Sequence, residues 1–164
     1  MLNAGANEAN LNMVIADVTD PQGRKQIISS TIEKFGQLDI LVNNAGAAFN
    51  GDDGTSGISN STTLLEKNMN LNVYSVVDMI QLARPYLVKT KGEIVNISSI
   101  CGQPTSVSSQ LFRKCGFERY RTPKNLLQYA PFAYYAMSKA ALDQMMRSAA
   151  IDLIKEGVRV NGVR

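Results

Sequence analysis

Short runs of buried-type residues alternate along this chain with longer segments of helical periodicity. Four runs predict strands: "MVIADV" (13–18), "LDILVN" (38–43), "GEIVNISS" (92–99) and "VRVNGV" (158–163). Apolar residues recur at helical spacing in the segments between them, over 19–36, 62–89 and 134–157. Strands of this kind that alternate with helices are typical of a parallel sheet. The pattern therefore predicts an α/β fold with a mainly parallel sheet.

The first helical segment carries its own start and stop signals. Asp20 suits the N-cap, Pro21 suits the first helical position, and Gly36 suits the C-terminal stop. Pro85 predicts a kink or an end in the second helical segment. Residues 47–61 are rich in Gly, Ser, Asn and Asp, so we expect a loop there.

Polar residues stand at the carboxyl ends of three predicted strands. Asp17 ends the first strand, "NNAG" (43–46) follows the second, and Ser98 and Ser99 end the third. Ligands of parallel α/β sheets bind outside the carboxyl ends of the strands. Each feature alone could be turn chemistry, and Asp17 could simply cap the following turn. Their convergence on one edge favours a functional site.

The composition of the 164 residues narrows the chemistry. Histidine is absent, which excludes His general bases, Ser-His-Asp triads and His-ligated metals. Cys101 and Cys115 form no CxxC pair, so we expect neither a disulfide framework nor a metal site. The net charge of +3 is too small to argue for nucleic acid or a membrane surface. The polar N-terminus and the lack of a long apolar run favour a cytoplasmic protein.

Two adjacent tyrosines precede a lysine in "YYAMSK" (134–139). Tyr135 and Lys139 are four residues apart and share a helix face, whereas the matching partner of Tyr134 is the uncharged Ser138. A free tyrosine has a pKa of about 10, and a nearby lysine stabilises the phenolate. Most pairs at this spacing are ordinary surface contacts. The spacing nevertheless selects Tyr135 as the reactive tyrosine and leaves Tyr134 as a packing residue.

Five motifs occur in order: "NNAG" (43–46), "NMNLNVYSVV" (68–77), "GEIVNISSICG" (92–102), "YYAMSKAALD" (134–143) and "EGVRVNGV" (156–163). This set resembles the short-chain dehydrogenase/reductase family over almost the whole chain except 103–131. The resemblance implies a Rossmann-like, doubly wound parallel sheet. It also implies hydride transfer between NAD or NADP and a small-molecule alcohol or ketone. A homo-oligomer through the helices near 62–89 and 134–156 is implied as well.

The resemblance also assigns roles to residues. It makes Tyr135 the catalytic acid/base and Lys139 the residue that lowers the tyrosine pKa and binds the nicotinamide ribose. Ser99 orients the substrate oxygen, and Asn72 helps to hold a proton-relay water, although it could instead bond backbone as a mid-helix residue. The implied cofactor-binding residues are Asp17, Val18, Asn44, Ala45, Gly46, Tyr135 and Lys139. Asn43 is expected to stabilise the sheet, and Met145 and Met146 are expected in the core.

The chain departs from the family pattern at both ends. The family's glycine-rich turn, which carries the pyrophosphate, has no counterpart before residue 13. The family's first two strands, which would lie between 13–18 and 38–43, are absent with it. Either these two strands then pair directly, or the first is loose. We expect the isolated chain to be poorly stable and to bind cofactor weakly or not at all. The C-terminal part that would set substrate specificity is also absent.

An atypical insertion at 106–131 separates Ser99 from Tyr135, where the family has a short loop. It is basic and has little periodicity. It is either a lid-like substrate loop or translated non-coding sequence, and we favour the second. A nucleic-acid-binding role is disfavoured because the segment lacks a recognisable motif. Two hypotheses remain for the partial domain 1–164. One is an oxidoreductase with a Ser-Tyr-Lys-Asn site, and the other is a non-catalytic fragment or pseudo-enzyme that acts as an interaction or dimerisation module.

Overall fold

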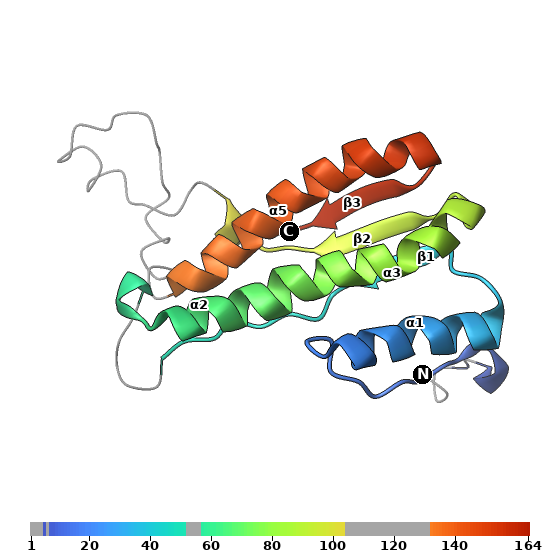
Figure 1. Cartoon of the computed structure of the whole chain (residues 1–164), viewed down its shortest axis with the longest axis horizontal. Helices are drawn as coiled ribbons and strands as arrows, with labels where there is room; N and C mark the ends of the chain where they lie inside the picture. Colours follow the sequence, from blue (N-terminus) through green and yellow to red (C-terminus); the bar gives the residue numbers. More distant parts are fainter. Residues whose placement is uncertain (1–4, 6, 52–56, 104–131) are drawn as a thin grey trace.

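The described strands form a three-stranded parallel sheet, which is covered by helices on one face (Figure 1). The computed structural model describes residues 5, 7–51, 57–103 and 132–164. The strands are β1 (Ile40–Asn43), β2 (Glu93–Ile97) and β3 (Arg159–Val163), and their order in the sheet is β1-β2-β3. The α/β class and the parallel sheet are therefore confirmed. The insertion expected at 106–131 lies outside the described residues.

The helices follow the predicted segments closely. They are α1 (Pro21–Phe35), α2 (Thr62–Met69), the π-helical turn η4 (Asn70–Tyr74), α3 (Ser75–Thr90) and α5 (Ala133–Leu153). Short 3-10 turns cover Glu8–Asn10, Gly57–Ser59, Ile100–Gly102 (η5) and Ile154–Glu156 (η7). The predicted caps of α1 are confirmed, because Asp20 accepts from the N–H of Gln22 and Gly36 has a φ of 75°. Pro85 lies inside α3 and does not end it.

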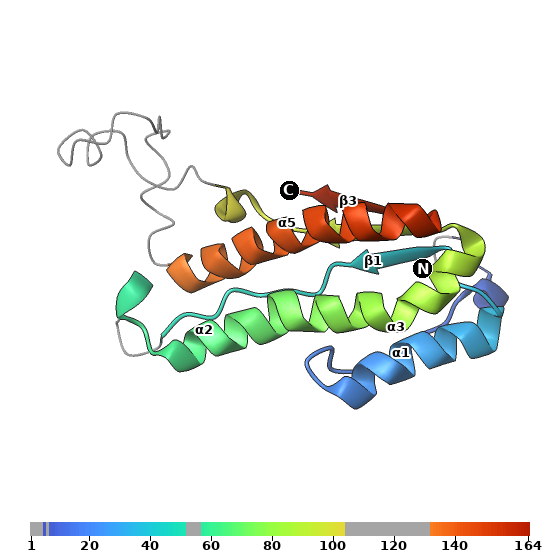
Figure 2. The same ribbon diagram turned by 45° about the horizontal axis from the view of Figure 1, so that its top comes forward.

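The helices α3 and α5 lie side by side across one face of the sheet, and α1 lies beside α3 (Figures 1 and 2). The helix α3 connects β1 to β2, and α5 connects β2 to β3; right-handed crossovers in one direction place these two helices on the same face. The core fills the space between this face and the helices. Its buried side chains include Ile28, Leu41, Ile80, Ala83, Leu87, Ile94, Leu142 and Leu153.

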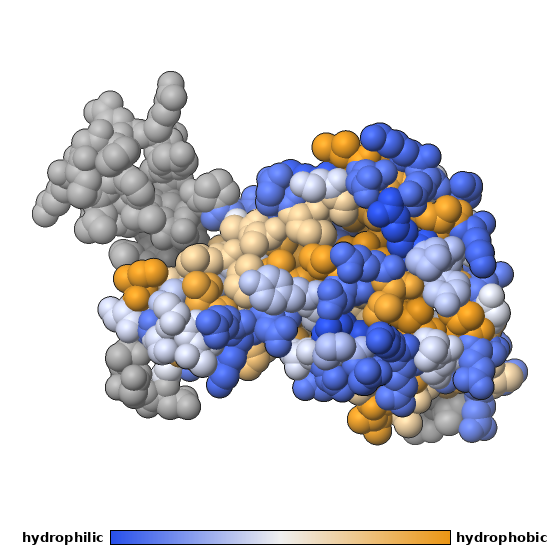
Figure 3. Space-filling view, viewed as in Figure 1, coloured by the Kyte–Doolittle hydropathy of each residue, from blue (hydrophilic) through white to orange (hydrophobic). Residues whose placement is uncertain are grey.

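The opposite face of the sheet carries exposed apolar residues. Side chains alternate between the two faces along a strand, so the neighbours of the buried Leu41 point away from the core. Ile40 and Val42 are 59% and 56% exposed, and Val163 at the end of β3 is 52% exposed. On the helical side, Figure 3 shows apolar residues in a band between α3 and α5. This band contains a groove of about 290 Å³, lined on its apolar side by Val77, Ile80, Met145, Ala149 and Leu153.

The prediction of a strand at 13–18 is wrong. Residues 11–17 adopt no regular structure, and Asp17 and Val18 begin a turn instead of ending a strand. Met13 and Ile15 are 85% and 89% exposed. A strand forms only where a neighbour completes its ladder of hydrogen bonds, and β1 pairs with β2 rather than with this segment. Of the two outcomes expected for 13–18, the loose one is what the structure shows.

Candidate active site

Asn72 lies in the π-helical turn that joins α2 to α3. Such turns occur frequently at functional sites. Asn72 is 1% exposed, and its side-chain amide bonds both backbone groups of Ala47, accepting from N–H at 3.2 Å and donating to C=O at 2.9 Å. It also donates to the Ser138 hydroxyl at 3.1 Å. Asn72 therefore bonds backbone, and this backbone belongs to the residue that follows the NNAG turn; its role toward a proton-relay water stays a prediction.

Lys139 reaches the carboxyl end of β2 and the NNAG turn together. Its side chain is buried, and Nζ donates to the carbonyl oxygen of Ile97 at 2.9 Å. Nζ lies 5.7 Å from the centroid of the Tyr135 ring. A Cβ added to Gly46 would lie 3.4 Å from Nζ and 2.9 Å from Oδ1 of Asn72. The structure thus brings Tyr135, Lys139, Gly46 and Asn72 into one contiguous group.

The surroundings of Lys139 shift the pKa of its amine. Burial lowers its pKa below the ordinary value of 10.5, and the negative charge of Asp143 opposes this shift. A lysine without a full hydration shell is stabilised in its charged form by the acceptors and rings that surround it. Its environment is therefore set by the carbonyl of Ile97 and the face of Tyr135.

The two neighbouring tyrosines have different surroundings. Tyr134 is 5% exposed, and its hydroxyl donates to the carbonyl oxygen of Asn60 at 2.7 Å. Tyr135 is half-buried, and its carbonyl oxygen accepts from Ser138 Oγ at 2.7 Å. Tyr134 is therefore a packing residue, as expected, and Tyr135 is the tyrosine that faces the lysine.

Ser99 stands at the start of the short turn η5. Its Oγ accepts from the N–H of Cys101 at 3.2 Å, while Ser98 is buried. The turn packs closely on α5, because a Cβ added to Gly102 would lie 2.8 Å from the carbonyl carbon of Lys139. The turn that begins at Ser99 thus packs on the helix that carries Tyr135 and Lys139.

Of the two cofactor-binding residues expected near the N-terminus, Val18 lies at a cavity and Asp17 does not. Val18 lines a cavity of about 150 Å³ together with Asn43, Asn44, Ala45, Ser75 and Met79. Asp17 does not line it. The carboxylate of Asp17 accepts from the N–H and the hydroxyl of Thr19, both at 2.8 Å, and these bonds lower the pKa of Asp17. Asp17 therefore caps the turn that follows it, as the alternative interpretation expects, and its role beside the cofactor stays a prediction.

Asn43 also behaves as expected. Its Nδ2 donates to Oδ1 of Asn96 at 2.8 Å, and the two residues are paired in the register of β1 and β2. This bond crosses the sheet between neighbouring strands. Asn43 therefore stabilises the sheet, and it lines the cavity together with Asn44 and Ala45 of the same turn.

Sequence reasoning missed Asn68, which is fully buried one helical turn before Asn72. Its side chain accepts from the N–H of Phe49 at 3.2 Å and donates to the carbonyl oxygen of Phe49 at 3.0 Å. Ser138, which links Asn72 to Tyr135, was also missed as a site residue. The available signal was the spacing in "NMNLN", which places two asparagines four residues apart on one helix face.

Known proteins are similar to this chain in sequence and in fold. Residues 2–111 match the family described as short chain dehydrogenase. The chain belongs to this family. It is 32% identical over 149 residues to L-fucose dehydrogenase of Rattus norvegicus and 29% identical over 147 residues to meso-2,3-butanediol dehydrogenase of Serratia marcescens. These alignments cover 88% and 90% of this chain but 44% and 48% of the relatives. The chain therefore spans about half the length of the short-chain dehydrogenases that it matches.

Solved structures of the family share the fold. A short-chain dehydrogenase/reductase of unknown function from Caenorhabditis elegans, crystallised with cofactor, matches with a TM-score of 0.83 and 42% identity over 99% of this chain and 52% of that chain. A 7α-hydroxysteroid dehydrogenase complexed with NADH matches with a TM-score of 0.67 and 28% identity, over 90% of this chain and 47% of that one. The predicted Rossmann-like, doubly wound fold is thus confirmed for the part of it that this chain contains.

The family match ends before Tyr135 and Lys139, so their assignment depends on their own motif and geometry. Within the described part of the chain, no group of three or more Cys, Asp or Glu residues could hold a metal ion. No helix among the same residues has the length and apolar character needed to cross a membrane.

Proposed function

We propose that this chain carries the catalytic residues of an NAD(P)(H)-dependent oxidoreductase acting on a hydroxyl or carbonyl substrate. The observation that supports this most strongly is the placement of Lys139. A buried amine lies 5.7 Å from the Tyr135 ring and directly beside the NNAG turn. A lysine that served only to pack α5 would not need contact with both a tyrosine and a glycine turn at the sheet edge.

Each residue has a chemical task in this proposal. Tyr135 gives a proton to the substrate oxygen during reduction and takes it back during oxidation. The positive charge of Lys139 attracts the negative charge that develops on the phenol oxygen as the proton leaves. The bond that Ser99 accepts from Cys101 does not use its hydroxyl hydrogen, which can be donated to the substrate oxygen. Asn72 holds the segment after the NNAG turn in place.

The residues present fit a nicotinamide dinucleotide. Gly46 leaves open the space that a Cβ would fill between Asn72 and Lys139. The cavity beside Val18, Asn44 and Ala45 has apolar walls that suit the flat face of an adenine. When bound, the cofactor supplies or accepts the hydride. None of the residues described above distinguishes NAD from NADP, so the experiment below uses both cofactors.

A pair of tyrosine variants provides the decisive experiment. Tyr135→Phe removes the proposed acid/base, whereas Tyr134→Phe removes a buried hydroxyl that bonds Asn60. The 164-residue chain is titrated with NADH and NADPH by nicotinamide fluorescence, and turnover is measured with a panel of ketones and secondary alcohols, sugars included. We expect weak cofactor binding in both variants. We expect turnover to fall by about 10²-fold or more in Tyr135→Phe only.

The alternative function predicts a different outcome. A non-catalytic chain with the family's core would show no turnover with any substrate and no difference between the two tyrosine variants. Equal turnover by Tyr135→Phe and the unmodified chain would also refute the assignment of Tyr135. The homo-oligomer expected through residues 62–89 and 134–156 stays a prediction, and light scattering of the purified chain measures it directly.

A further inference from the structure

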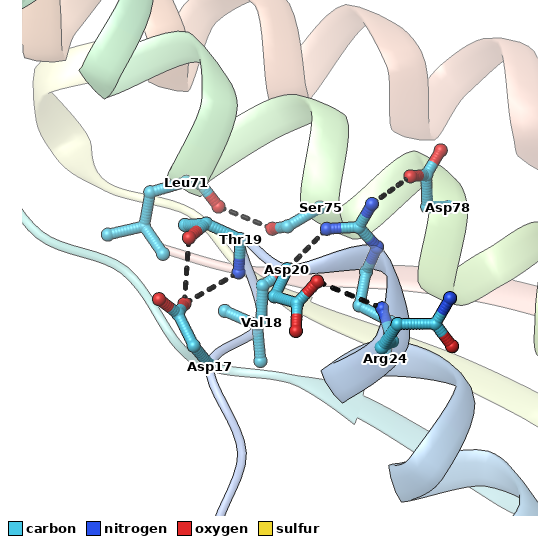
Figure 4. A network of polar contacts seen from close by, with 9 residues as sticks. Asp17, Val18, Thr19, Asp20, Arg24, Leu71, Ser75 and Asp78 are labelled. Carbon is cyan, nitrogen blue, oxygen red and sulfur yellow. Dashed lines mark hydrogen bonds and ion pairs between the residues drawn. The ribbon is translucent and has the colours of Figure 1, made fainter.

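Arg24 is an arginine buried near the start of α1, where the sequence gives no reason for a charge to be hidden. It is 5% exposed. One guanidinium nitrogen donates to the carbonyl oxygen of Val18 at 2.7 Å, and another pairs with Asp78 of α3 at 2.5 Å (Figure 4). Burying a charged side chain is costly unless its bonds are specific. The two bonds of this guanidinium join three segments: α1, the turn at Val18, and α3.

The turn itself is fixed to α1. The N–H of Asp20 donates to the carbonyl oxygen of Asp17 at 3.1 Å. A Cβ added to Gly23 would lie 2.4 Å from that same carbonyl oxygen, so the turn lies directly against the first helical residues. The turn and α1 therefore form one unit.

The residues before the turn are anchored to the same helix. Lys34 Nζ donates to the carbonyl oxygen of Leu11 at 2.5 Å, and Asn12 donates to Ser30 at 2.8 Å. The Arg24–Asp78 pair leads instead to α3. The Arg24–Asp78 pair thus joins the turn and α1 to α3 by a contact different from those that hold the turn to α1.

The cavity beside the NNAG turn lies between α3 on one side and the Val18 turn with α1 on the other. Val18 and Ile27 come from the turn and α1, and Ser75, Val76 and Met79 come from α3. Arg24 and Asp78 line a neighbouring hollow rather than this cavity, but Arg24 bonds the carbonyl oxygen of the lining residue Val18, and Asp78 is adjacent in sequence to the lining residue Met79. Breaking the bridge would remove the polar contact between the two walls and leave only the apolar packing of α1 on α3.

We propose that Arg24 is a positioning residue for the adenine end of the dinucleotide site. It acts through the carbonyl of Val18 and sets the separation between the Val18 turn and α3. The inference rests on the proposed function, because it assigns that cavity to the adenine. It goes beyond that function by naming a residue outside the expected cofactor set, and by restricting its influence to one end of the cofactor.

The test compares the two ends of the cofactor with separate probes. AMP reports on the adenine end and nicotinamide mononucleotide on the opposite end, and both are titrated into the 164-residue chain by two-dimensional NMR, which detects weak binding. Arg24→Gln removes the bridge. Arg84→Gln is the matched control, because Arg84 also joins two helical segments through Glu156 and Asp152 but lies on another part of α3.

We expect Arg24→Gln to raise the Kd for AMP by about twofold or more, the change that the loss of one hydrogen bond produces at the lower end of its range. The Kd for nicotinamide mononucleotide should not change, and Arg84→Gln should leave both values unchanged. An equal loss of both ligands in Arg24→Gln would overturn the inference, since a purely structural role has that effect. Unchanged AMP binding would also overturn it.

Two further outcomes are informative. If Arg24→Gln does not fold, Asp78→Asn keeps the bond to Val18 and weakens only the anchor on α3, and the same selective loss of AMP is expected. Equal binding of AMP by Asp78→Asn and the unmodified chain would then overturn the inference. If the unmodified chain binds neither probe, the proposed function fails and this inference fails with it. If it binds both and the variants match it, only this inference fails.

Discussion

Asn68 and Asn72 lie four residues apart on one helical segment and bind the backbones of Phe49 and Ala47, which lie two residues apart in the facing loop. Four helical residues rise by about 6 Å, and two residues of extended chain span about 6.6 Å. Each side-chain amide accepts from the backbone N–H and donates to the backbone C=O of one loop residue, as the backbone of a neighbouring strand would. The two asparagines therefore hold the segment after the NNAG turn by a ladder of side chains.

This ladder predicts that Asn68→Ala destabilises the chain. Asn68 is fully buried, and its loss leaves the N–H and C=O of Phe49 without their partner. The expected cost is about 1–3 kcal/mol in the free energy of unfolding, measured by urea denaturation. Asn70→Ala is the control, because Asn70 is exposed on the same helical segment. Similar stabilities for the two variants would show that the ladder does not hold the loop.

Gly23→Ala should destabilise α1, although alanine is a better helix former than glycine. The added Cβ would lie 2.4 Å from the carbonyl oxygen of Asp17, so the turn must move away from the helix. We expect a loss of about 1–3 kcal/mol, as for other overpacked sites. Gln26→Ala, at an exposed position of the same helix, is the comparison in a thermal melt. A higher melting temperature for Gly23→Ala would contradict the close packing of the turn.

Lys139 predicts a specific pH dependence of stability. Its folded pKa lies below 10.5 because of burial, so between that lowered pKa and 10.5 the unfolded chain binds more protons than the folded chain. The free energy of unfolding therefore rises with pH across this window, and the cost of burying the charged amine is fully present below it. Lys139→Met lacks this titration. Urea unfolding across the window should show the unmodified chain gaining stability relative to Lys139→Met.

The control for this titration is Lys155→Met, which removes an exposed lysine. Its stability should run parallel to that of the unmodified chain over the same pH range. If the curve of Lys139→Met also runs parallel, the amine is not desolvated in the folded state.

Ile15→Ser should change the free energy of unfolding by no more than about 0.5 kcal/mol, as exposed substitutions do. Ile15 is 89% exposed in a segment without regular structure. The matched substitution Ile94→Ser affects a fully buried residue of β2 and should destabilise strongly. A large loss from Ile15→Ser would mean that residues 13–18 form a buried strand after all.

The isolated chain should melt at low temperature and without a sharp transition. One face of its sheet leaves Ile40, Val42 and Val163 more than half exposed. Apolar area that stays in water contributes nothing to the hydrophobic stabilisation of the fold. Calorimetry of the purified chain measures this, and a cooperative transition at high temperature would be evidence against it.

Local sequence predicted the helices well because their signals are local. Asp20, Pro21 and Gly36 define the ends of α1 through bonds and backbone angles within a few residues. The parallel sheet was also predictable, since β1, β2 and β3 each combine an apolar run with a following or preceding helix. The run at 13–18 has the same appearance, but a strand needs a partner that local sequence does not contain.

The candidate site also combines features that local sequence predicts with features that depend on contacts between distant residues. The sequence alone determined the family and selected Tyr135 over Tyr134, because a spacing of four residues on a helix is a one-dimensional property. Only the tertiary structure decided that Asn72 and Asn68 hold the loop after the NNAG turn, that Asp17 caps its own turn, and that Arg24 bridges two walls of a cavity. Those contacts join residues that are distant in sequence, and their geometry depends on how the helices pack on the sheet.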